Sequence, residues 1–196
     1  MSWHTVALAD VVPSAWKNGG GTTRELLAWP SPADWVFRLS VAEVQADGPF
    51  SSFAGVERWF AVLSGAGVRL RLGAAAPFGV HALTHTLNTA SAPFCFDGAL
   101  PVDCTLMDGA TQDFNLMVRA DQARAQMQRV ADSLKNEGAG PRTVAVWTGE
   151  AGAALWLGQE CTPVRAHTLA WQALPAGAAL EVIALDALFM EIQPCP

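Results

Sequence analysis

The sequence predicts an all-β fold of the sandwich or barrel type, on three observations. Most of the chain divides into short apolar or alternating runs separated by Gly, Pro, Asn or Asp, which is typical of such folds. Helical periodicity over a helix length is nearly absent. The 196 residues, 51% of them hydrophobic, are enough for one large β domain or two small packed lobes with a real core.

The expected strands are segments that alternate or stay apolar between turn residues. "VRLRL" shows the pattern best, because Val68, Leu70 and Leu72 lie on one side and Arg69 and Arg71 on the other. In chain order the expected strands are residues 22–29, 34–44, 57–65, 67–73, 81–88, 113–119, 143–149 and 179–185.

The stretch 121–138 is ambiguous. Ala123, Met127, Val130 and Leu134 fit a helical face that ends at a Gly, but its first half alternates as a strand does, so periodicity leaves both structures open. A Gly/Pro-containing break at 136–141 follows. We place the boundary between lobes there. The expected domains are residues 1–136, with the ligand pocket, and a smaller C-terminal lobe, 137–196, packed on the first.

Charge argues against nucleic acid as a partner. The chain has 12 Lys and Arg against 18 Asp and Glu, a net charge of −6, which repels a phosphate backbone unless the cations are gathered in one place. Lys17, Arg24, Arg38 and Arg58 all fall in the first third of the chain. A local anion site therefore stays open.

The cysteines and the apolar runs bound the cellular setting. Cys95, Cys104, Cys161 and Cys195 show no C-x-x-C spacing, so neither a zinc site nor a redox pair is indicated. The first twelve residues lack a basic segment and contain Asp10, unlike a secretory signal. No apolar run reaches the roughly 18 residues of a membrane span. We expect a reduced, cytoplasmic protein without a membrane partner.

No metal, cofactor or catalytic residue is expected. His81 and His85 would lie about 13 Å apart on a strand, and no nearby pair of carboxylates completes a metal site. A G-x-S-x-G elbow is absent. Glu25, Glu57 and Asp113 could form a carboxylate pair in three dimensions, but they are expected to pair with the arginines instead.

The segment "AWKNGGGTTRE", residues 15–25, places three glycines in a row. It matches neither of the two phosphate-binding glycine patterns. Only eight residues separate Gly21 from Pro30, too few for the helix that those patterns require. Asn-Gly favours a hairpin turn. One glycine satisfies a turn, so the excess indicates close approach of the backbone to another strand or to a ligand.

Two strands carry polar residues on one face. In "DFNLMVR", Asp113, Asn115, Met117 and Arg119 share a face, which is either solvent-exposed or the interior of a barrel that holds a small polar ligand. In residues 35–42 we expect Trp35, Phe37, Leu39 and Val41 on the core face and Arg38 on the solvent face. Phe50 and Phe53 are expected to plug one end of the sandwich.

Four segments in this order resemble the HutD/Ves family: "WKNGGGTTRE", "W-x-x-R-L-S-x-A" at 35–42, "DGPFSSFAGVER" and "DFNLMVR". The resemblance covers residues 16–119, with a looser match beyond. It implies a bicupin, two jelly-roll β-sandwich lobes in one chain, with residues 121–134 mainly β and without the metal-binding motif of ordinary cupins. It also implies a pocket in the first lobe for a small organic acid, such as formylglutamate, urocanate or a formate-like ligand.

The family motifs, carried over by position, imply the site residues. Cationic forks and amide donors match carboxylate oxygens, whereas carboxylates would orient those cations. The ligand-facing set is Lys17, Asn18, Arg24, Arg38, Arg58 and Asn115; Glu25 and Asp113 orient them; Thr22 and Ser40 add hydroxyls; and Trp16, Phe50, Phe53 and Met117 form the apolar wall. On this view the extra glycines pass close to the acid.

The function expected from the resemblance is binding without catalysis, which modulates histidine or amino-acid catabolism. One alternative is a metal-independent cupin enzyme, an isomerase or hydrolase of a small carboxylic acid, which requires a carboxylate with a raised pKa beside the cations. Another is an interaction module with a vestigial pocket. A homodimer is also compatible with the sequence.

Overall fold

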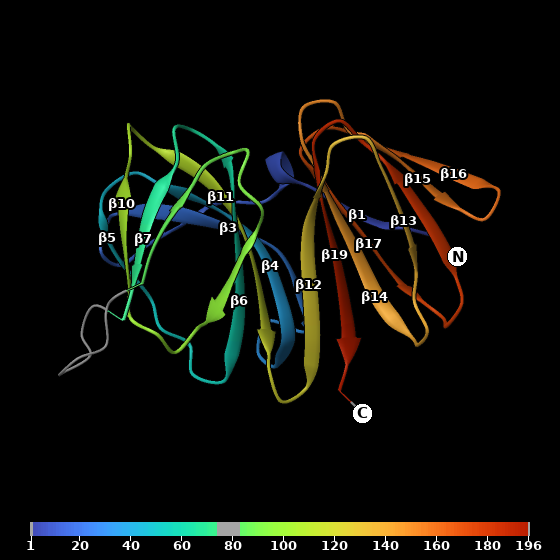
Figure 1. The fold of residues 1–196 in the computed structure, drawn as a ribbon, viewed down its shortest axis with the longest axis horizontal. Coiled ribbons are helices and arrows are strands. Elements are labelled where there is room, and N and C mark those ends of the chain that lie inside the picture. Colours follow the sequence, from blue (N-terminus) through green and yellow to red (C-terminus); the bar gives the residue numbers. More distant parts are fainter. Residues whose placement is uncertain (1, 74–82, 196) are drawn as a thin grey trace. The chain divides into compact units, whose positions relative to one another are not determined.

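A computed structural model describes residues 2–73 and 83–195. Within these ranges the chain forms strands and one short 3-10 helix, Leu8–Asp10, and no α-helix. The all-β prediction is confirmed. Two compact units are present: unit 1 combines Met1–Val11 with Gln122–Pro196, and unit 2 is Val12–Asp121. Figure 1 labels most of their strands.

Unit 2 contains a six-stranded and a four-stranded antiparallel sheet. The six-stranded sheet has the order β2 (Ser14–Ala15), β3 (Gly21–Pro30), β4 (Trp35–Val44), β11 (Thr111–Arg119), β6 (Val56–Ser64) and β9 (Phe94–Asp97). The four-stranded sheet has the order β5 (Gly48–Phe50), β10 (Val102–Leu106), β7 (Val68–Leu72) and β8 (Leu83–Leu87). One core joins them, with Phe60 and Val62 from the first sheet against Leu70 and Val102 from the second.

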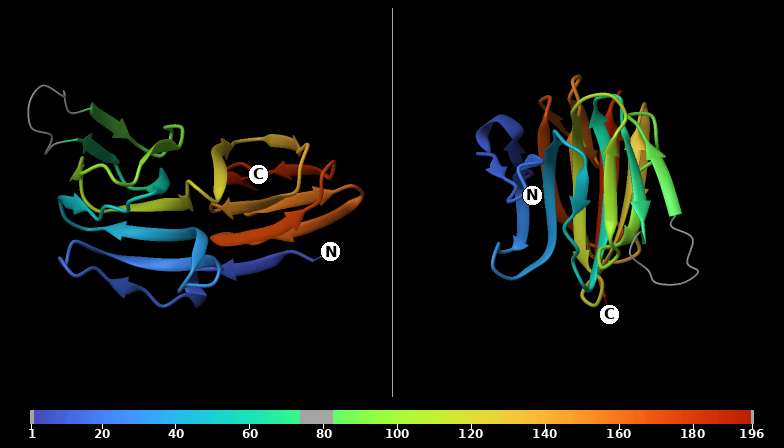
Figure 2. Two further views of the ribbon diagram at one scale, coloured as in Figure 1. Left: turned by 90° about the horizontal axis from the view of Figure 1, so that it is seen from below. Right: turned by 90° about the vertical axis from the view of Figure 1, so that its left-hand side faces the viewer.

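Unit 1 is built in the same way. Its five-stranded sheet has the order β1 (His4–Ala7), β17 (Thr168–Leu174), β14 (Arg142–Thr148), β19 (Ala187–Pro194) and β12 (Ala123–Val130). Its four-stranded sheet has the order β13 (Ser133–Glu137), β18 (Ala179–Ile183), β15 (Ala153–Leu157) and β16 (Glu160–Val164). Val146 and Phe189 pack with Leu155 and Val182 across the two layers. Figure 2 shows the strands of the chain from two further sides.

The units divide at a different place from the boundary we expected at 136–137. That position lies within β13, inside unit 1. The reason is strand pairing: β12 pairs with β19, and β13 pairs with β18. The ambiguous stretch is therefore two strands rather than a helix. Ala123, Ala125 and Met127 are buried on β12, as the alternating pattern requires.

The predicted strand 81–88 is described only from residue 83, where β8 begins. His81, one of the two histidines considered as metal ligands, lies outside the described residues. His85 lies on β8, and its ring centroid is 3.9 Å from that of Phe94.

The three glycines serve the turn and the sheet. Gly19 has a φ of +71°, and its N–H donates to the Trp16 carbonyl at 3.0 Å. The Gly20 N–H donates to Asn18 Oδ1 at 3.1 Å. A Cβ on Gly21 would lie 2.2 Å from the carbonyl oxygen of Glu43 on β4, so the backbones of β3 and β4 meet there. Close approach to a strand explains the glycine at position 21. The expected close approach of this segment to a ligand stays a prediction.

Gly21→Ala should lower the free energy of unfolding by more than about 2 kcal/mol, because the clashing atom is backbone and cannot rotate away. Gly20→Ala is the matched control, since its Cβ would meet only the Asn18 side chain at 3.4 Å, and it should change stability by less than about 0.5 kcal/mol. Urea denaturation of both variants measures the difference. Equal effects at the two positions would contradict this account.

Candidate functional site

Cross-strand pairing decides which side chains share a face of the six-stranded sheet in unit 2. Met117 of β11 pairs with Arg38 of β4 and with Arg58 of β6. Two residues away, Asn115 pairs with Phe60 of β6. Directly paired residues point to the same face. Because Phe60 belongs to the core between the two sheets, this face points into the sandwich, and we call it the interior face.

The interior face collects most of the side chains that the motifs implied. Those placed there by register are Glu25, Arg38, Ser40, Arg58, Asp113, Asn115 and Met117. Trp16 and Phe50 pack against the same core. Of the two locations left open for the polar residues of "DFNLMVR", the structure has the interior one: Asp113 is 0% and Asn115 3% exposed. Arg38 lies on this face too, and not on a solvent face.

Thr22 and Arg24 are on the opposite face of the sheet. Thr22 pairs with Glu43, and Arg24 pairs with Val41. Val41 is the chain neighbour of Ser40, so it points to the face opposite the interior one. The Arg24 guanidinium forms an ion pair with Glu43 at 2.5 Å. Strand alternation alone separates Arg24 from Glu25, so the motif could not place both at one site. The interior threonine of β3 is Thr23.

Three further implied residues are not brought to the cluster by any contact. Lys17 and Asn18 are exposed in the turn before β3, and the Asn18 side chain accepts the hydrogen bond from Gly20. Phe53 is half-buried after β5, where its N–H donates to the Gly98 carbonyl at 2.6 Å.

Arg58 is a buried cation held by a neutral partner. Its residue exposure is 7%, and Nε and Nη2 donate to Asn115 Oδ1 at 3.0 and 2.7 Å. Its Cζ atom lies 4.7 Å from the ring centroid of Phe50 and 5.5 Å from that of Phe96. No ion pair joins it to a carboxylate in the part of the chain that is described. Burial lowers the pKa of Arg58 to about 10, so the side chain stays charged at neutral pH.

Arg38 occupies the more accessible part of the interior face. Its Nη2 forms an ion pair with Glu25 at 2.8 Å, and the two side chains are 24% and 35% exposed. Glu25 therefore orients a cation, as implied. Nε of Arg38 is buried and has no hydrogen-bond partner among the described residues. Solvent and a small solute can reach this pair.

Asn115, and not Asp113, accepts the hydrogen bonds of Arg58 in the described structure. Instead, Oδ2 of Asp113 accepts a hydrogen bond from Thr111 Oγ1 at 2.8 Å, and Oδ1 is buried without a partner in the described structure. Burial raises the pKa of this carboxyl group to about 7, although the Thr111 bond and the charge of Arg58 lower it. The protonated form is thus accessible near neutrality.

An aromatic wall closes the cluster on one side. Trp16 donates from Nε1 to Thr23 Oγ1 at 2.8 Å. Its ring contacts Phe50 edge-on, with the ring centroids 6.3 Å apart, and the ring centroids of Phe50 and Phe60 are 5.8 Å apart. Sequence reasoning missed Thr23, Phe60 and Phe96. Alternation offered Thr23 and Thr22 equally, and nothing local in the sequence places Phe96 beside Arg58.

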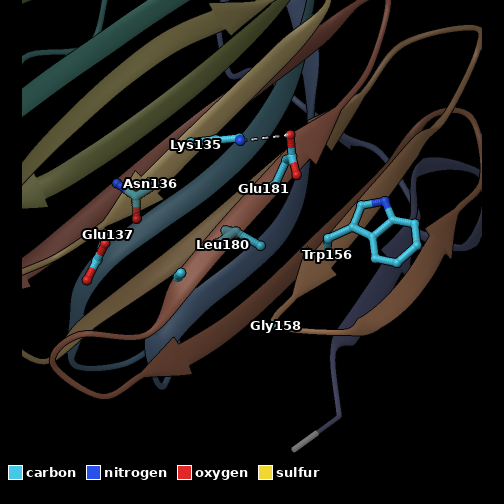
Figure 3. A pocket seen from close by; sticks show the side chains of 8 residues that line it. Lys135, Asn136, Glu137, Trp156, Gly158, Leu180 and Glu181 are labelled. Carbon is cyan, nitrogen blue, oxygen red and sulfur yellow. Dashed lines mark ion pairs between the residues drawn. The ribbon is translucent and has the colours of Figure 1, made fainter.

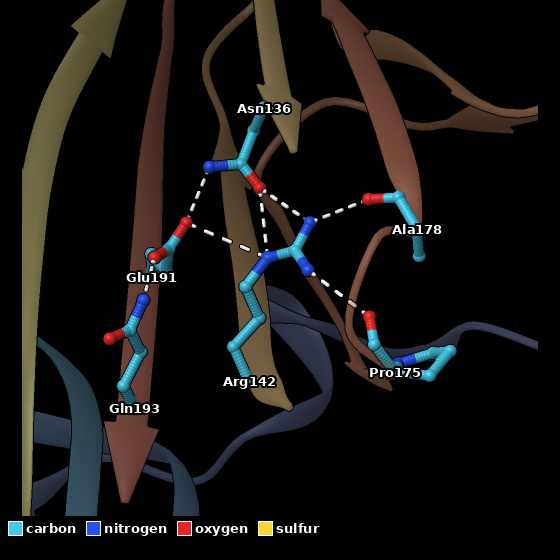
Figure 4. Close-up of polar contacts among 6 residues, drawn as sticks. All are labelled: Asn136, Arg142, Pro175, Ala178, Glu191 and Gln193. Atoms are coloured by element: carbon cyan, nitrogen blue, oxygen red, sulfur yellow. Dashed lines mark hydrogen bonds and ion pairs between the residues drawn. The ribbon is translucent and has the colours of Figure 1, made fainter. Parts of the chain in front are cut away.

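Unit 1 contains a second buried arginine whose surroundings differ. Arg142 donates from Nε and Nη2 to Asn136 Oδ1 at 3.0 and 2.8 Å, from Nη2 to the Ala178 carbonyl at 2.7 Å and from Nη1 to the Pro175 carbonyl at 3.3 Å. Glu191 Oε2 lies 3.6 Å from Nε and accepts from Asn136. Figure 4 shows this closed network. Arg142 has its charge paired within the fold and serves the structure of unit 1.

A depression of about 300 Å³ lies on the four-stranded sheet of unit 1. Trp156, Glu181 and Lys135 border it, and a 3.9 Å ion pair links the last two. As Figure 3 shows, its polar groups belong to strand surfaces and do not converge on one point. It lacks a buried charge and is a weaker candidate site than the interior face of unit 2.

The described residues contain no cluster of three or more His, Cys, Asp or Glu side chains placed to hold a metal ion. They also contain no helix with the length and apolarity needed to cross a membrane.

A family model described as HutD matches residues 8–189. The chain belongs to the HutD family. Over 119 residues it is 41% identical to Protein Ves of Citrobacter koseri, covering 60% of this chain and 58% of that protein. A Pseudomonas putida protein described as uncharacterized and in the hutC 3' region is 36% identical over 115 residues, 58% of this chain and 56% of its own. The chain thus matches less than two-thirds of these relatives' length.

Solved structures extend the HutD likeness to the whole chain. HutD from Pseudomonas fluorescens SBW25, described with a formate condition, has a TM-score of 0.82 at 26% identity, with 100% of both chains covered. A conserved protein of unknown function from Pseudomonas aeruginosa PAO1 gives 0.83 at 28%, also with full coverage. A variant of Bacillus subtilis oxalate decarboxylase gives 0.61 at 9% identity, covering 96% of this chain and 76% of its own. These neighbours support a cupin β-sandwich fold.

The raised pKa of Asp113 predicts the direction in which the free energy of unfolding changes with pH. The folded pKa of about 7 lies above the ordinary value of about 3.9, so the folded state binds the proton more tightly. The free energy of unfolding should therefore fall as pH rises from about 4 to about 7, by an amount on the order of 4 kcal/mol from this group.

Urea denaturation across that pH range tests the prediction. Asp113→Asn should remove the contribution of this carboxyl group to the pH dependence of the free energy of unfolding. The difference in stability between wild type and variant should therefore change with pH. Asp103→Asn, which alters an exposed carboxylate on β10, should run parallel to wild type. Parallel curves for Asp113→Asn would contradict the prediction.

Proposed function

We propose that this HutD-family chain is a bicupin that binds a small organic acid on the interior face of unit 2 and thereby modulates histidine or amino-acid breakdown, without catalysing a reaction. The observation that carries the proposal is the buried guanidinium of Arg58. It is held by the amide of Asn115 and has no carboxylate ion-pair partner among the described residues.

A buried charge without a partner is costly, and proteins normally pair it. The bonds to Asn115 use Nε and Nη2, and no acceptor for Nη1 is found in the described structure. A ligand carboxylate would supply both the missing negative charge and the missing acceptor. Arg38, on the far side of Met117 in the same row, provides a second cation for the acid.

The relatives support the choice of ligand and pathway. The P. fluorescens HutD structure is described with a formate condition, and the P. putida relative lies in the hutC 3' region. We therefore propose formate, formylglutamate and urocanate as the first ligands to test. We further propose a cytoplasmic location.

A metal-independent enzyme is the second candidate, and one observation favours it. Asp113, with a pKa raised to about 7, could exchange a proton with a bound acid near neutral pH. Incubation of the protein with each of the three acids, followed by product analysis, tests this function. Turnover that Asp113→Asn abolishes would replace the binding proposal.

Arg38→Ala should weaken binding of whichever acid binds by at least about tenfold, because it removes a charge-assisted contact. The matched control is Arg24→Ala. Both arginines lie on adjacent strands of one sheet and pair with a glutamate, and their side chains are 24% and 23% exposed, but they are on opposite faces. Arg24→Ala should change affinity less than about twofold.

Calorimetric titration with formate, formylglutamate and urocanate measures these effects. No heat with any of the three acids, from protein that unfolds cooperatively, would overturn the proposed function. Equal weakening by the two alanine variants would show that the interior face is not the binding face.

A further inference from the structure

Asp113 is the most deeply buried charged residue of the interior face, and half of its carboxyl group is unused. The residue is 0% exposed. Its cross-strand neighbours are apolar, Ala42 on β4 and Val62 on β6. Thr111 donates to Oδ2, and Oδ1 has no partner among the described residues. A buried oxygen in this position calls for a partner that the fold itself does not provide.

The charged and titratable groups around Asp113 are few. Arg58 from β6 and Cys104 from β10 act on it electrostatically, and burial raises the pKa of the Cys104 thiol to about 12, so this group stays neutral. Asp47, whose Oδ1 accepts from the Leu106 N–H at 2.8 Å, is a further charge near Cys104. Arg58 is therefore the one cation acting on Asp113 within the described residues.

The two protonation states of Asp113 have opposite consequences for an incoming acid. If ionised, Asp113 offsets the charge of Arg58 and repels a carboxylate. If protonated, it leaves that charge for the ligand. Because Oδ2 accepts from Thr111, the proton resides on Oδ1, where it forms an O–H donor. Carboxylic acids kept neutral in apolar sites can serve as such donors.

We propose that Asp113 contacts the bound acid as a protonated carboxyl group, donating a hydrogen bond from Oδ1 to the ligand carboxylate beside Arg58, so that binding above neutral pH takes up one proton. The inference rests on the proposed function. The one bond that forms is the O–H bond on Oδ1, and its proton comes from solvent. The site then selects ionised carboxylates, which accept hydrogen bonds, over ligands that present an N–H donor at this position. The pKa of about 7 for Asp113 in the free protein is consistent with this role.

The test is titration calorimetry with sodium formate, which is ionised across the range from about pH 6 to about pH 8.5. Affinity should be nearly constant below about pH 7 and should fall by up to about tenfold per pH unit above it. At the upper end, heats measured in buffers of different ionisation enthalpy should report uptake of about one proton. Formylglutamate provides the second probe.

Asp113→Asn should flatten the pH profile to less than about a twofold change, since the amide donates at every pH. Asp97→Asn, which changes an exposed carboxylate on β9, should keep the wild-type slope. Binding of either acid with a flat wild-type profile and no buffer dependence overturns the role of Asp113 and leaves the proposed function standing. Absence of heat with both acids at every pH overturns this inference and counts against the proposed function.

Discussion

The interior face of unit 2 is organised around the burial of one positive charge. Arg58 lies between Met117 and Phe96 in a cross-strand row and contacts the rings of Phe50 and Phe96. Aromatic faces and one amide oxygen stabilise a guanidinium without neutralising it. Every strand that contributes to this environment must hold its register, because a slip of one residue would turn the polar side chains to the opposite face.

The two buried arginines show how one local contact can serve different ends. Both donate from Nε and Nη2 to a single asparagine oxygen. Arg142 adds two backbone carbonyls and the nearby Glu191, and its hydrogen bonds and charge are satisfied internally. Among the described residues, the further direct contacts of Arg58 are with two aromatic rings. An arginine whose charge is paired within the fold has few free donors and little uncompensated charge for a ligand. An arginine held by neutral groups keeps its charge available. This difference distinguishes the buried arginines of the two units.

Much of the fold followed from the sequence, and less of the site did. Alternation in 113–119 correctly grouped Asp113, Asn115 and Met117 on one face, although it could not say whether that face was inside. Motif membership placed Thr22 and Arg24 at the site, because a motif records neighbours along the chain and not the side of the sheet. A register shift between Glu25 and Leu27 is also invisible in composition. The lobe boundary was misplaced for a similar reason, since the strand partners of β12 and β13 lie between 42 residues (Glu137 to Ala179) and 71 residues (Ala123 to Pro194) further along the chain.

The pairing of β1 with β17 has a consequence for biosynthesis. Unit 2 is one continuous segment, Val12–Asp121, whereas unit 1 needs residues from both ends of the chain. All strands of unit 2 have therefore been synthesised before β12 to β19, the strands that Gln122–Pro196 contributes to unit 1. The first strand, His4–Ala7, emerges earliest, but its partner spans Thr168–Leu174. On the ribosome it must wait, unpaired, while a whole sandwich can form behind it.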